Sequence, residues 1–150
     1  MEFNFNIKEK LFTEEEIYLF MEEALKECLK SLSEGEVPVG CVFVYIPNKK
    51  IILKGHNLTN ITKNATTHAE MNCINYISDL LQNKQEKNLF IKKFDINEED
   101  ALDSKKLLNK CALFVSCEPC IMCAYALNLV SINLCMMLNI KRHKESIFRL

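Results

Sequence analysis

The chain has 150 residues, of which 49% are hydrophobic and 26% are charged, as expected for one globular domain with a substantial core. Its formal net charge of -1 argues against a protein that binds nucleic acid strongly through its own overall charge. We find no secretory signal and no apolar run of membrane-spanning length, so we expect no membrane association, reduced thiols at the eight cysteines, and a cytoplasmic or nuclear location.

The first predicted element is a helix over residues 13–33. Thr13 and Glu16 have the spacing of a capping box, in which each side chain binds a free backbone N–H of the other residue. Apolar residues then recur every three or four positions, which is the period of a helix with one buried face. Gly35 follows the last of them, as is typical of a residue just beyond a helix.

Two strands and a polar loop are predicted next. The run over residues 41–46 is continuously apolar, and a second apolar run covers 51–56. A turn at 47–50 separates them, so we expect the two strands to pair as a hairpin. The loop over 57–67 is rich in threonine and asparagine, and it leads the chain to His68.

The pattern over residues 68–81 is helical, and it places His68 and Glu70 in the first turn. A helix start favours negative charge, which suits a carboxylate at this position. Residues 83–110 differ, because they are dense in charges of both signs and poor in apolar groups. We predict an inserted solvated loop there, partly helical, whose lysines are a candidate contact for RNA although the opposite charges nearly balance.

The last predicted elements are a third strand, a third helix and a fourth strand. The third strand covers 111–116, and Pro119 suits the first turn of the helix that follows. Cys120 and Cys123 are three positions apart, so they lie on one face of that helix and can share a metal ion. The fourth strand covers 132–138. The order of elements predicts a sheet covered by helices, with at least one parallel crossover.

Two short motifs carry the chemistry. One is His68-Ala69-Glu70, and the other is Pro119-Cys120-Ile121-Met122-Cys123. Zinc binds imidazole and thiolate ligands tetrahedrally, and a catalytic site keeps three protein ligands and leaves the fourth position for water. A histidine, a glutamate two residues later, and a Pro-Cys-x-x-Cys motif are together the signature of zinc-dependent nucleobase deaminases.

Other interpretations of the cysteines remain open at this point. A Cys-x-x-Cys motif alone also fits a redox pair or half of a structural zinc site. If Cys117 were a fourth ligand, the site would be closed and structural, although we expect Cys117 to end the strand outside the ligand set. The remaining cysteines occur in apolar patterns, and we expect them to be buried. They are Cys28, Cys41, Cys73, Cys111 and Cys135.

These motifs, together with Glu36-Val37-Pro38-Val39-Gly40 and Gly55-His56-Asn57, carry a family resemblance. The chain resembles the cytidine deaminase superfamily, and within it the tRNA-specific adenosine deaminases, especially their catalytic subunit 2 type. The resemblance implies an α/β fold, a three-layer α/β/α sandwich with a mixed central sheet. It also implies a single zinc deaminase domain of the CMP/dCMP type over 1–150, with a charged insertion at about 83–110. Residues 139–150 do not resemble the family's continuation, so we expect the sheet to be cut short after the fourth strand.

The resemblance also implies roles for individual residues. The implied zinc ligands are His68, Cys120 and Cys123. Glu70 would be the catalytic residue that shuttles protons during the reaction. Asn57 would contact the substrate nucleoside, and Val39 would line the pocket for the base.

The implied function is hydrolytic deamination of adenosine to inosine at wobble position 34 of tRNA. The implied partners are the tRNA anticodon loop and a second, deaminase-like subunit, which forms a heterodimer, or a second copy in a homodimer. One alternative is a deaminase of the same superfamily that acts on free nucleosides, nucleotides or guanine. Another is a non-catalytic interaction subunit that zinc stabilises.

Overall fold

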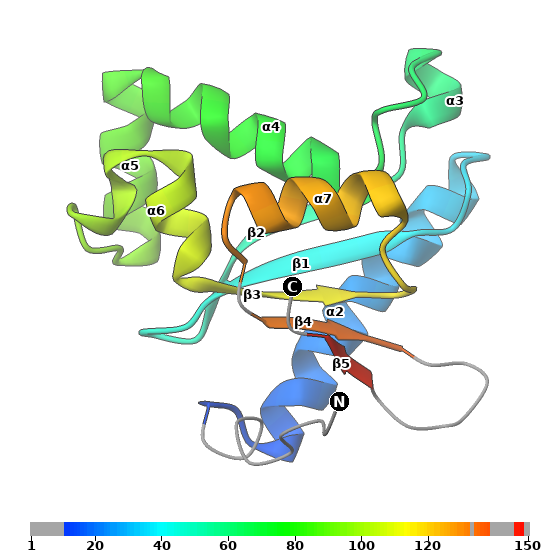
Figure 1. Ribbon diagram of the computed structural model, residues 1–150, viewed down its shortest axis with the longest axis horizontal. Coiled ribbons are helices and arrows are strands. Elements are labelled where there is room, and N and C mark those ends of the chain that lie inside the picture. The colour runs from blue at the N-terminus through cyan, green and yellow to red at the C-terminus, as the bar shows by residue number, and fades with distance from the viewer. Residues whose placement is uncertain (1–10, 133, 139–145, 149–150) are drawn as a thin grey trace.

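A mixed sheet lies at the centre of the computed structural model, which describes residues 11–132, 134–138 and 146–148 (Figure 1). The five strands lie in the order β2-β1-β3-β4-β5. They are β1 (Gly40–Tyr45), β2 (Lys50–His56), β3 (Cys111–Val115), β4 (Leu134–Met137) and β5 (Ser146–Phe148). The β3–β4 pair is parallel and the other pairs are antiparallel, which confirms the predicted mixed sheet.

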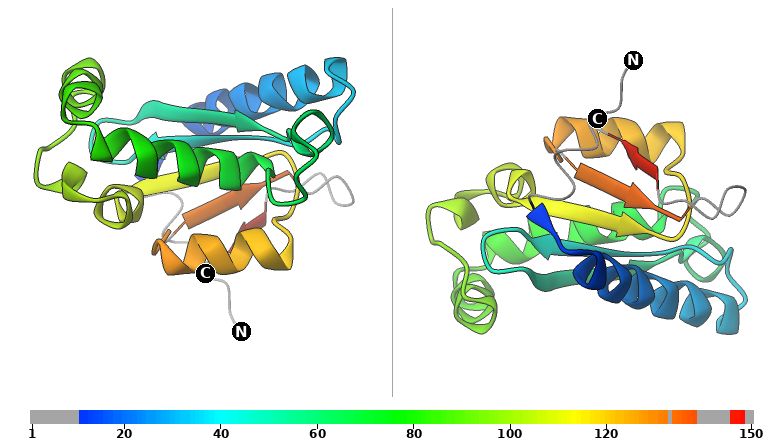
Figure 2. Two further views of the ribbon diagram at one scale, coloured as in Figure 1. Left: turned by 90° about the horizontal axis from the view of Figure 1, so that it is seen from above. Right: turned by 90° about the horizontal axis from the view of Figure 1, so that it is seen from below.

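Helices cover both faces of the sheet, which gives the predicted three-layer arrangement (Figure 2). Helix α2 (Glu14–Ser33) packs on one face, while α4 (Ala69–Gln82) and α7 (Ile121–Leu129) pack on the other. The side chains of β1 alternate between the layers, because Val42 lies in the core cluster under α2 and Phe43 lies in the cluster under α4 and α7. No helix of the described residues combines the length and the apolar character that a membrane span requires.

The N-terminal helix and the hairpin form as predicted. Thr13 and Glu16 make the capping box, with the Thr13 N–H donating to Glu16 Oε2 over 2.8 Å and the Glu16 N–H donating to Thr13 Oγ1 over 3.2 Å. Helix α2 crosses β1 closely at Gly40, where a Cβ atom would lie 2.2 Å from the backbone nitrogen of Cys28. Only glycine permits this approach, so Gly40 fixes the spacing between the helix and the sheet.

Two details near the end of the described chain differ from the prediction. The third helix begins at Ile121 with Cys120 as its N-cap residue, so Pro119 precedes the helix instead of lying in its first turn. The sheet does not stop at β4, because the three residues of β5 pair antiparallel with it. The prediction that the sheet ends after the fourth strand was therefore wrong, because one further short strand follows.

The segment 83–110 is also more regular than the predicted solvated loop. It contains α5 (Lys84–Phe94), the 3₁₀ helix η2 (Asp100–Leu102) and α6 (Ser104–Asn109). Five of its apolar side chains are buried in the core under α4, whereas Leu89 and Leu102 are exposed. The buried ones are Phe90, Ile96, Ala101, Leu107 and Leu108. Most of its charged side chains are exposed, so a sparse apolar face is enough to hold the segment against the domain.

Candidate metal and catalytic site

Two helix N-termini bring the predicted site residues together. His68 is the N-cap residue of α4, with extended backbone angles, and its carbonyl oxygen accepts a hydrogen bond from the Asn72 N–H over 2.9 Å. Glu70 is the second residue of α4 and is 2% exposed. The start of α4 therefore presents an imidazole and a buried carboxylate within three residues.

The two thiols come from the start of α7. Cys120 is its N-cap residue and is exposed, whereas Cys123 lies in the first turn and is buried. The Ala124 N–H donates to the Cys120 carbonyl over 2.8 Å, which closes this first turn. The turn places both sulfur atoms on the side of the helix that faces His68, as the spacing of three residues predicts.

The distances between these three side chains fit a zinc ion. His68 Nδ1 lies 3.6 Å from the Sγ atom of Cys120 and 3.6 Å from that of Cys123. A tetrahedral zinc with Zn–N bonds of about 2.0–2.1 Å and Zn–S bonds of about 2.3 Å holds its nitrogen and sulfur ligands about 3.6 Å apart. The donor set and the spacing therefore match zinc, with His68 binding through Nδ1.

The ligand group has three members, not four. Within the described residues, the potential ligand atoms that gather within 4.8 Å of one another belong to His68, Cys120 and Cys123 alone. Cys117 lies outside this group, as predicted, so the geometry is that of an open site. Glu70 is also outside the group, which leaves its carboxylate free for proton transfer.

The electrostatics around Cys123 favour a bound cation. Burial and the nearby Glu70 carboxylate raise the pKa of the Cys123 thiol. Burial and Glu70 also raise the pKa of Cys117. A divalent cation between the ligands would offset this accumulation of buried negative charge and hold the thiols as thiolates.

The two predicted substrate contacts lie beside each other. The Asn57 N–H donates to the Val39 carbonyl over 3.1 Å, and Asn57 is 4% exposed. Val39 precedes Gly40, which exchanges hydrogen bonds with Ser116 at the end of β3. The Leu58 N–H donates to the carbonyl of Thr67, the residue before His68, over 3.0 Å. The fold thus brings both residues to the sheet end from which the ligands project, while their contact with a substrate stays a prediction.

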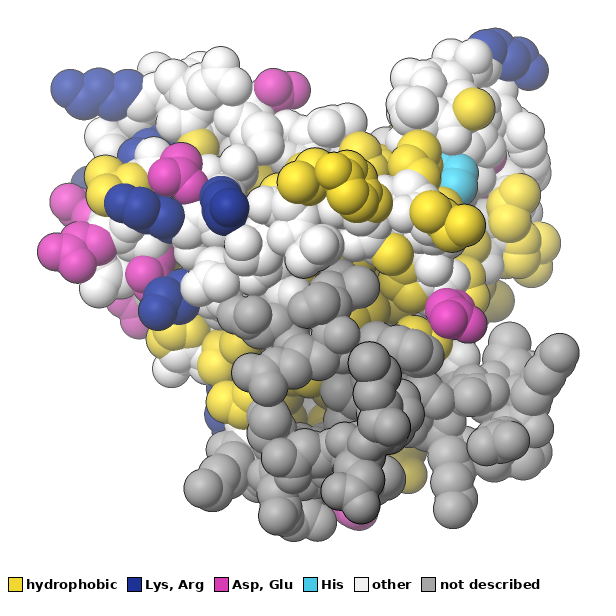
Figure 3. Space-filling model, viewed as in Figure 1, with side chains coloured by type: hydrophobic (Ala, Val, Ile, Leu, Met, Phe, Trp, Pro, Cys, Tyr) yellow, Lys and Arg dark blue, Asp and Glu magenta, His cyan; other side chains and the backbone are white. Residues whose placement is uncertain are grey.

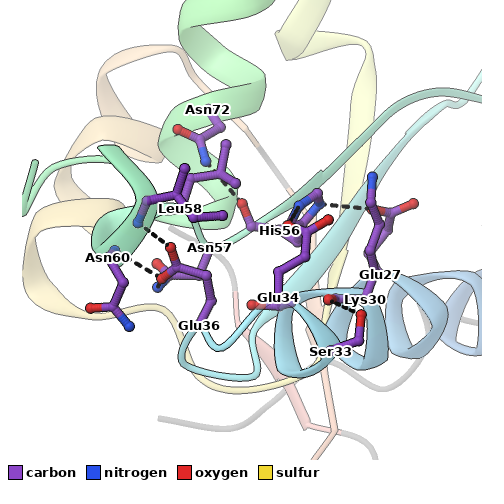
Figure 4. A network of polar contacts seen from close by, with 12 residues as sticks. Glu27, Lys30, Ser33, Glu34, Glu36, His56, Asn57, Leu58, Asn60 and Asn72 are labelled. Atoms are coloured by element: carbon purple, nitrogen blue, oxygen red, sulfur yellow. Dashed lines mark hydrogen bonds and ion pairs between the residues drawn. The ribbon is translucent and has the colours of Figure 1, made fainter. Parts of the chain in front are cut away.

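Two polar residues here have more partners than the sequence suggests (Figure 4). Glu36 is 4% exposed and accepts hydrogen bonds from Asn57, Thr59 and two backbone N–H groups. The His56 ring lies between two carboxylates, with Nδ1 3.1 Å from Glu27 Oε2 and Nε2 3.0 Å from Glu34 Oε2. The only signal for either residue was its place inside a motif, since a single polar residue does not reveal its partners.

The charged segment lies away from this site. Helices α5 and α6 lie at the end of α4 opposite to α3 (Thr59–Thr62) and the helix N-termini (Figures 1 and 2). Lysines of α5 and α6 therefore do not surround the metal ligands. The predicted RNA contact of these lysines gains no support from their position.

Comparisons with known proteins agree with the site. The family described as the "Cytidine and deoxycytidylate deaminase zinc-binding region" matches residues 14–139. The chain is 38% identical to tRNA-specific adenosine deaminase 2 of Danio rerio over 120 residues, which are 80% of this chain and 48% of that protein. It is 38% identical over 119 residues to a tRNA-specific adenosine deaminase of Streptococcus pyogenes, covering 79% of this chain and 59% of that protein. The chain thus spans about half to three fifths of the length of these relatives.

Solved structures show the same fold. One comes from a study of A-to-I editing by tRNA:A34 deaminases at the wobble position of transfer RNA, with a TM-score of 0.59 and 27% identity. That match covers 80% of this chain and 74% of the other. A guanine deaminase of Bacillus subtilis gives a TM-score of 0.56 at 23% identity, covers 85% of this chain and 64% of that one, and shows the likeness of fold alone.

Proposed function

Because the chain belongs to the cytidine and deoxycytidylate deaminase zinc-binding family, we propose that it converts adenosine to inosine at wobble position 34 of tRNA. The observation that carries this proposal is the meeting of His68, Cys120 and Cys123 beside the buried carboxylate of Glu70. The relatives named tRNA-specific adenosine deaminase supply the choice of adenosine in tRNA over other bases.

The reaction replaces the amino group at C6 of adenine with the oxygen of water and releases ammonia. Zinc, when bound by His68, Cys120 and Cys123, supplies an activated water at this position. Glu70 is not a ligand, so its carboxylate takes a proton from the attacking water. It then delivers protons to the ring nitrogen and to the departing amino group, which leaves as ammonia. Burial of Glu70 keeps bulk water away from these transfers.

The substrate base has to leave its stack to reach this site. A nucleobase deaminase acts on a base that is flipped out of single-stranded nucleic acid into a pocket. An anticodon loop offers such a base. Val39 lines the pocket for adenine, and Asn57 binds the nucleoside at the mouth of the same pocket.

A second subunit is part of this proposal. The net charge of -1 gives the chain little general affinity for RNA, so another chain has to supply part of the basic surface. We propose a deaminase-like partner in a heterodimer, or a second copy in a homodimer. Helix α7, whose N-terminus provides the two thiols, has exposed apolar side chains on its outer face, and these offer a surface for the second subunit (Figure 3). They are Ile121, Tyr125 and Leu129, which are 91%, 65% and 56% exposed.

The proposal also covers the domain organisation and the cellular location of the enzyme. Residues 1–150 form a single zinc deaminase domain with a charged insertion at about 83–110. None of the eight cysteines, which all lie in the described part of the chain, forms a disulfide and five are buried, which suits the reducing cytoplasm or nucleus.

The test is inosine formation in a tRNA with adenosine at position 34, using the chain alone and co-expressed with a deaminase-like partner. The same preparations are assayed with free adenosine, cytidine, deoxycytidylate and guanine. Inosine at position 34 alone supports the proposal. Turnover of a free base, nucleoside or nucleotide without inosine in tRNA would replace it with the corresponding free-substrate deaminase. Bound zinc without any turnover would indicate a non-catalytic interaction subunit.

A further inference from the structure

The carboxylate of Glu36 is a buried charge that is stabilised by hydrogen bonds alone. Glu36 is 4% exposed, and no lysine, arginine or histidine of the described residues forms an ion pair with it. Its Oε1 atom accepts from the Ile61 N–H over 2.8 Å. Its Oε2 atom accepts from the Asn60 N–H, Asn57 Nδ2 and Thr59 Oγ1 over 3.0, 3.1 and 3.3 Å. Although burial alone would raise the pKa of Glu36, these bonds lower it, so the group stays a carboxylate.

This arrangement sets the orientation of the Asn57 side chain. The two N–H bonds of Asn57 Nδ2 face acceptors, Glu36 Oε2 at 3.1 Å and Thr59 Oγ1 at 2.9 Å. If the amide were turned over, its oxygen would face the Glu36 carboxylate, and two acceptors would repel each other. The oxygen Oδ1 therefore points away from Glu36, and no donor of the described residues binds it.

The same loop joins Asn57 to the metal ligands. The bond from the Leu58 N–H to the Thr67 carbonyl closes the loop directly before His68. The side-chain amide of Asn72 donates to the carbonyls of His56 and Thr67, over 2.9 and 3.2 Å, and so holds both ends of the loop on α4 (Figure 4). Glu36 binds the first half of this loop, from Asn57 to Ile61, so it orients the Asn57 amide that the loop presents to a nucleoside.

We propose that Glu36 is a positioning residue that makes Asn57 present a hydrogen-bond acceptor, and so selects a ribose with a free 2′-hydroxyl. This inference rests on the proposed function, which places an adenosine at the site. An adenosine inside an RNA chain has two hydrogen-bond donors, the 6-amino group and the 2′-hydroxyl. The amino group is at the reacting centre, so the 2′-hydroxyl is the donor left for Asn57 Oδ1. A deoxynucleoside lacks that donor.

The test compares an anticodon stem-loop carrying adenosine at the target position with one carrying 2′-deoxyadenosine there. Four proteins are needed besides the wild type: Glu36→Gln, Asn57→Asp, the double variant, and the control Glu34→Gln. Glu34 lies two residues from Glu36, but its carboxylate contacts His56 and not the loop. The readouts are kcat and KM for both substrates, zinc per chain, and exchange of the Asn57 side-chain amide protons.

We expect the wild type and Glu34→Gln to prefer the ribose substrate by about tenfold in kcat/KM, the effect of one hydrogen bond. Glu36→Gln loses this preference and keeps its zinc, because the Asn57 amide is then free to turn. Asn57→Asp loses activity, because two carboxylates would meet. The double variant regains the preference, since the new amide at position 36 donates to the new carboxylate at position 57, and an acceptor again faces the substrate.

Two results would overturn the proposal. The first is a double variant whose fold-loss in kcat/KM equals the product of the fold-losses of the two single variants. That result would make Glu36 a purely structural residue. The second is a wild type that does not distinguish the two sugars. If the wild type does not deaminate the stem-loop at all, the proposed function fails, and amide exchange still decides the role of Glu36. Slow exchange of the Asn57 side-chain protons that becomes fast in Glu36→Gln supports the positioning role, and exchange that does not change refutes it.

Discussion

His68 Nδ1 lies 3.6 Å from Cys123 Sγ, although 55 residues separate the two along the chain. If a zinc ion lies between them, metal binding should depend strictly on both side chains. We expect Cys123→Ser to lose the metal and the part of the stability that metal binding supplies. Zinc per chain, measured by mass spectrometry after dialysis, and the Tm with and without a chelator are the measurements.

Cys117→Ser is the matched control for that variant. Cys117 is six residues from Cys123 but outside the ligand group, so its variant should keep one zinc per chain. Loss of zinc from Cys117→Ser would show a fourth protein ligand, and the open catalytic site would have to be abandoned for a closed structural one.

Glu70→Gln should separate chemistry from metal binding. The amide has nearly the shape of the carboxylate but cannot accept and return a proton, so we expect inosine formation to fall at least about a hundredfold. Zinc content and Tm should stay near those of the wild type. Glu118→Gln removes an exposed carboxylate beside the ligands and should keep full activity. Equal activity in the two variants would remove Glu70 from the mechanism.

Tyr45 holds the charged segment to the sheet, and this contact predicts a pH dependence. Its hydroxyl donates to Asp100 over 2.5 Å, and burial together with this bond raises the pKa of Tyr45 to about 12. The unfolded pKa is about 10, so the stabilisation is complete below pH 10 and is lost as the pH rises towards 12. Tyr45→Phe should lower the free energy of unfolding by about 2 kcal/mol at pH 8. In denaturant titrations the difference in free energy of unfolding between Tyr45→Phe and the wild type should become smaller above pH 10. A difference that does not change with pH would contradict the raised pKa of Tyr45.

Gly40→Ala should destabilise the fold strongly. Its Cβ atom would lie 2.2 Å from the Cys28 nitrogen and 2.4 Å from the Ala24 oxygen, and neither backbone atom can move without displacing α2. We expect a loss of more than about 3 kcal/mol of stability, measured by denaturant unfolding. Gly35→Ala has no neighbour within 4 Å and should cost only the strain of its positive φ, about 1 kcal/mol. Similar losses in the two variants would refute the close crossing.

The parts of the molecule that repeat a local pattern could be predicted from the sequence. The capping box of Thr13 and Glu16, the apolar strands and the spacing of Cys120 and Cys123 each reflect a local rule, and each occurs in the structure. The fit of His68 to the two thiols could be expected only because the paired motif is itself known.

Long-range packing explains what the sequence analysis missed. Segment 83–110 has too few apolar residues to predict its helices, yet Phe90 and Leu107 are buried because α4 and β3 offer them a surface. The hydrogen-bond partners of Glu36 are 21–25 residues away in the sequence. The orientation of the Asn57 side-chain amide could therefore be known only from the folded chain.

The two halves of the metal site also differ in when they are made. At a synthesis rate of about 5–20 residues per second, Cys123 follows His68 out of the ribosome by roughly 3–11 s. During almost all of that interval His68 is the one member of the ligand group that the nascent chain contains, and a single imidazole is a poor metal site by itself. The parallel pairing of β3 with β4 comes later still, because β4 follows α7 in the chain. A zinc ion could therefore find its full ligand set only after α7 had been synthesised, and not while the chain ended at α4.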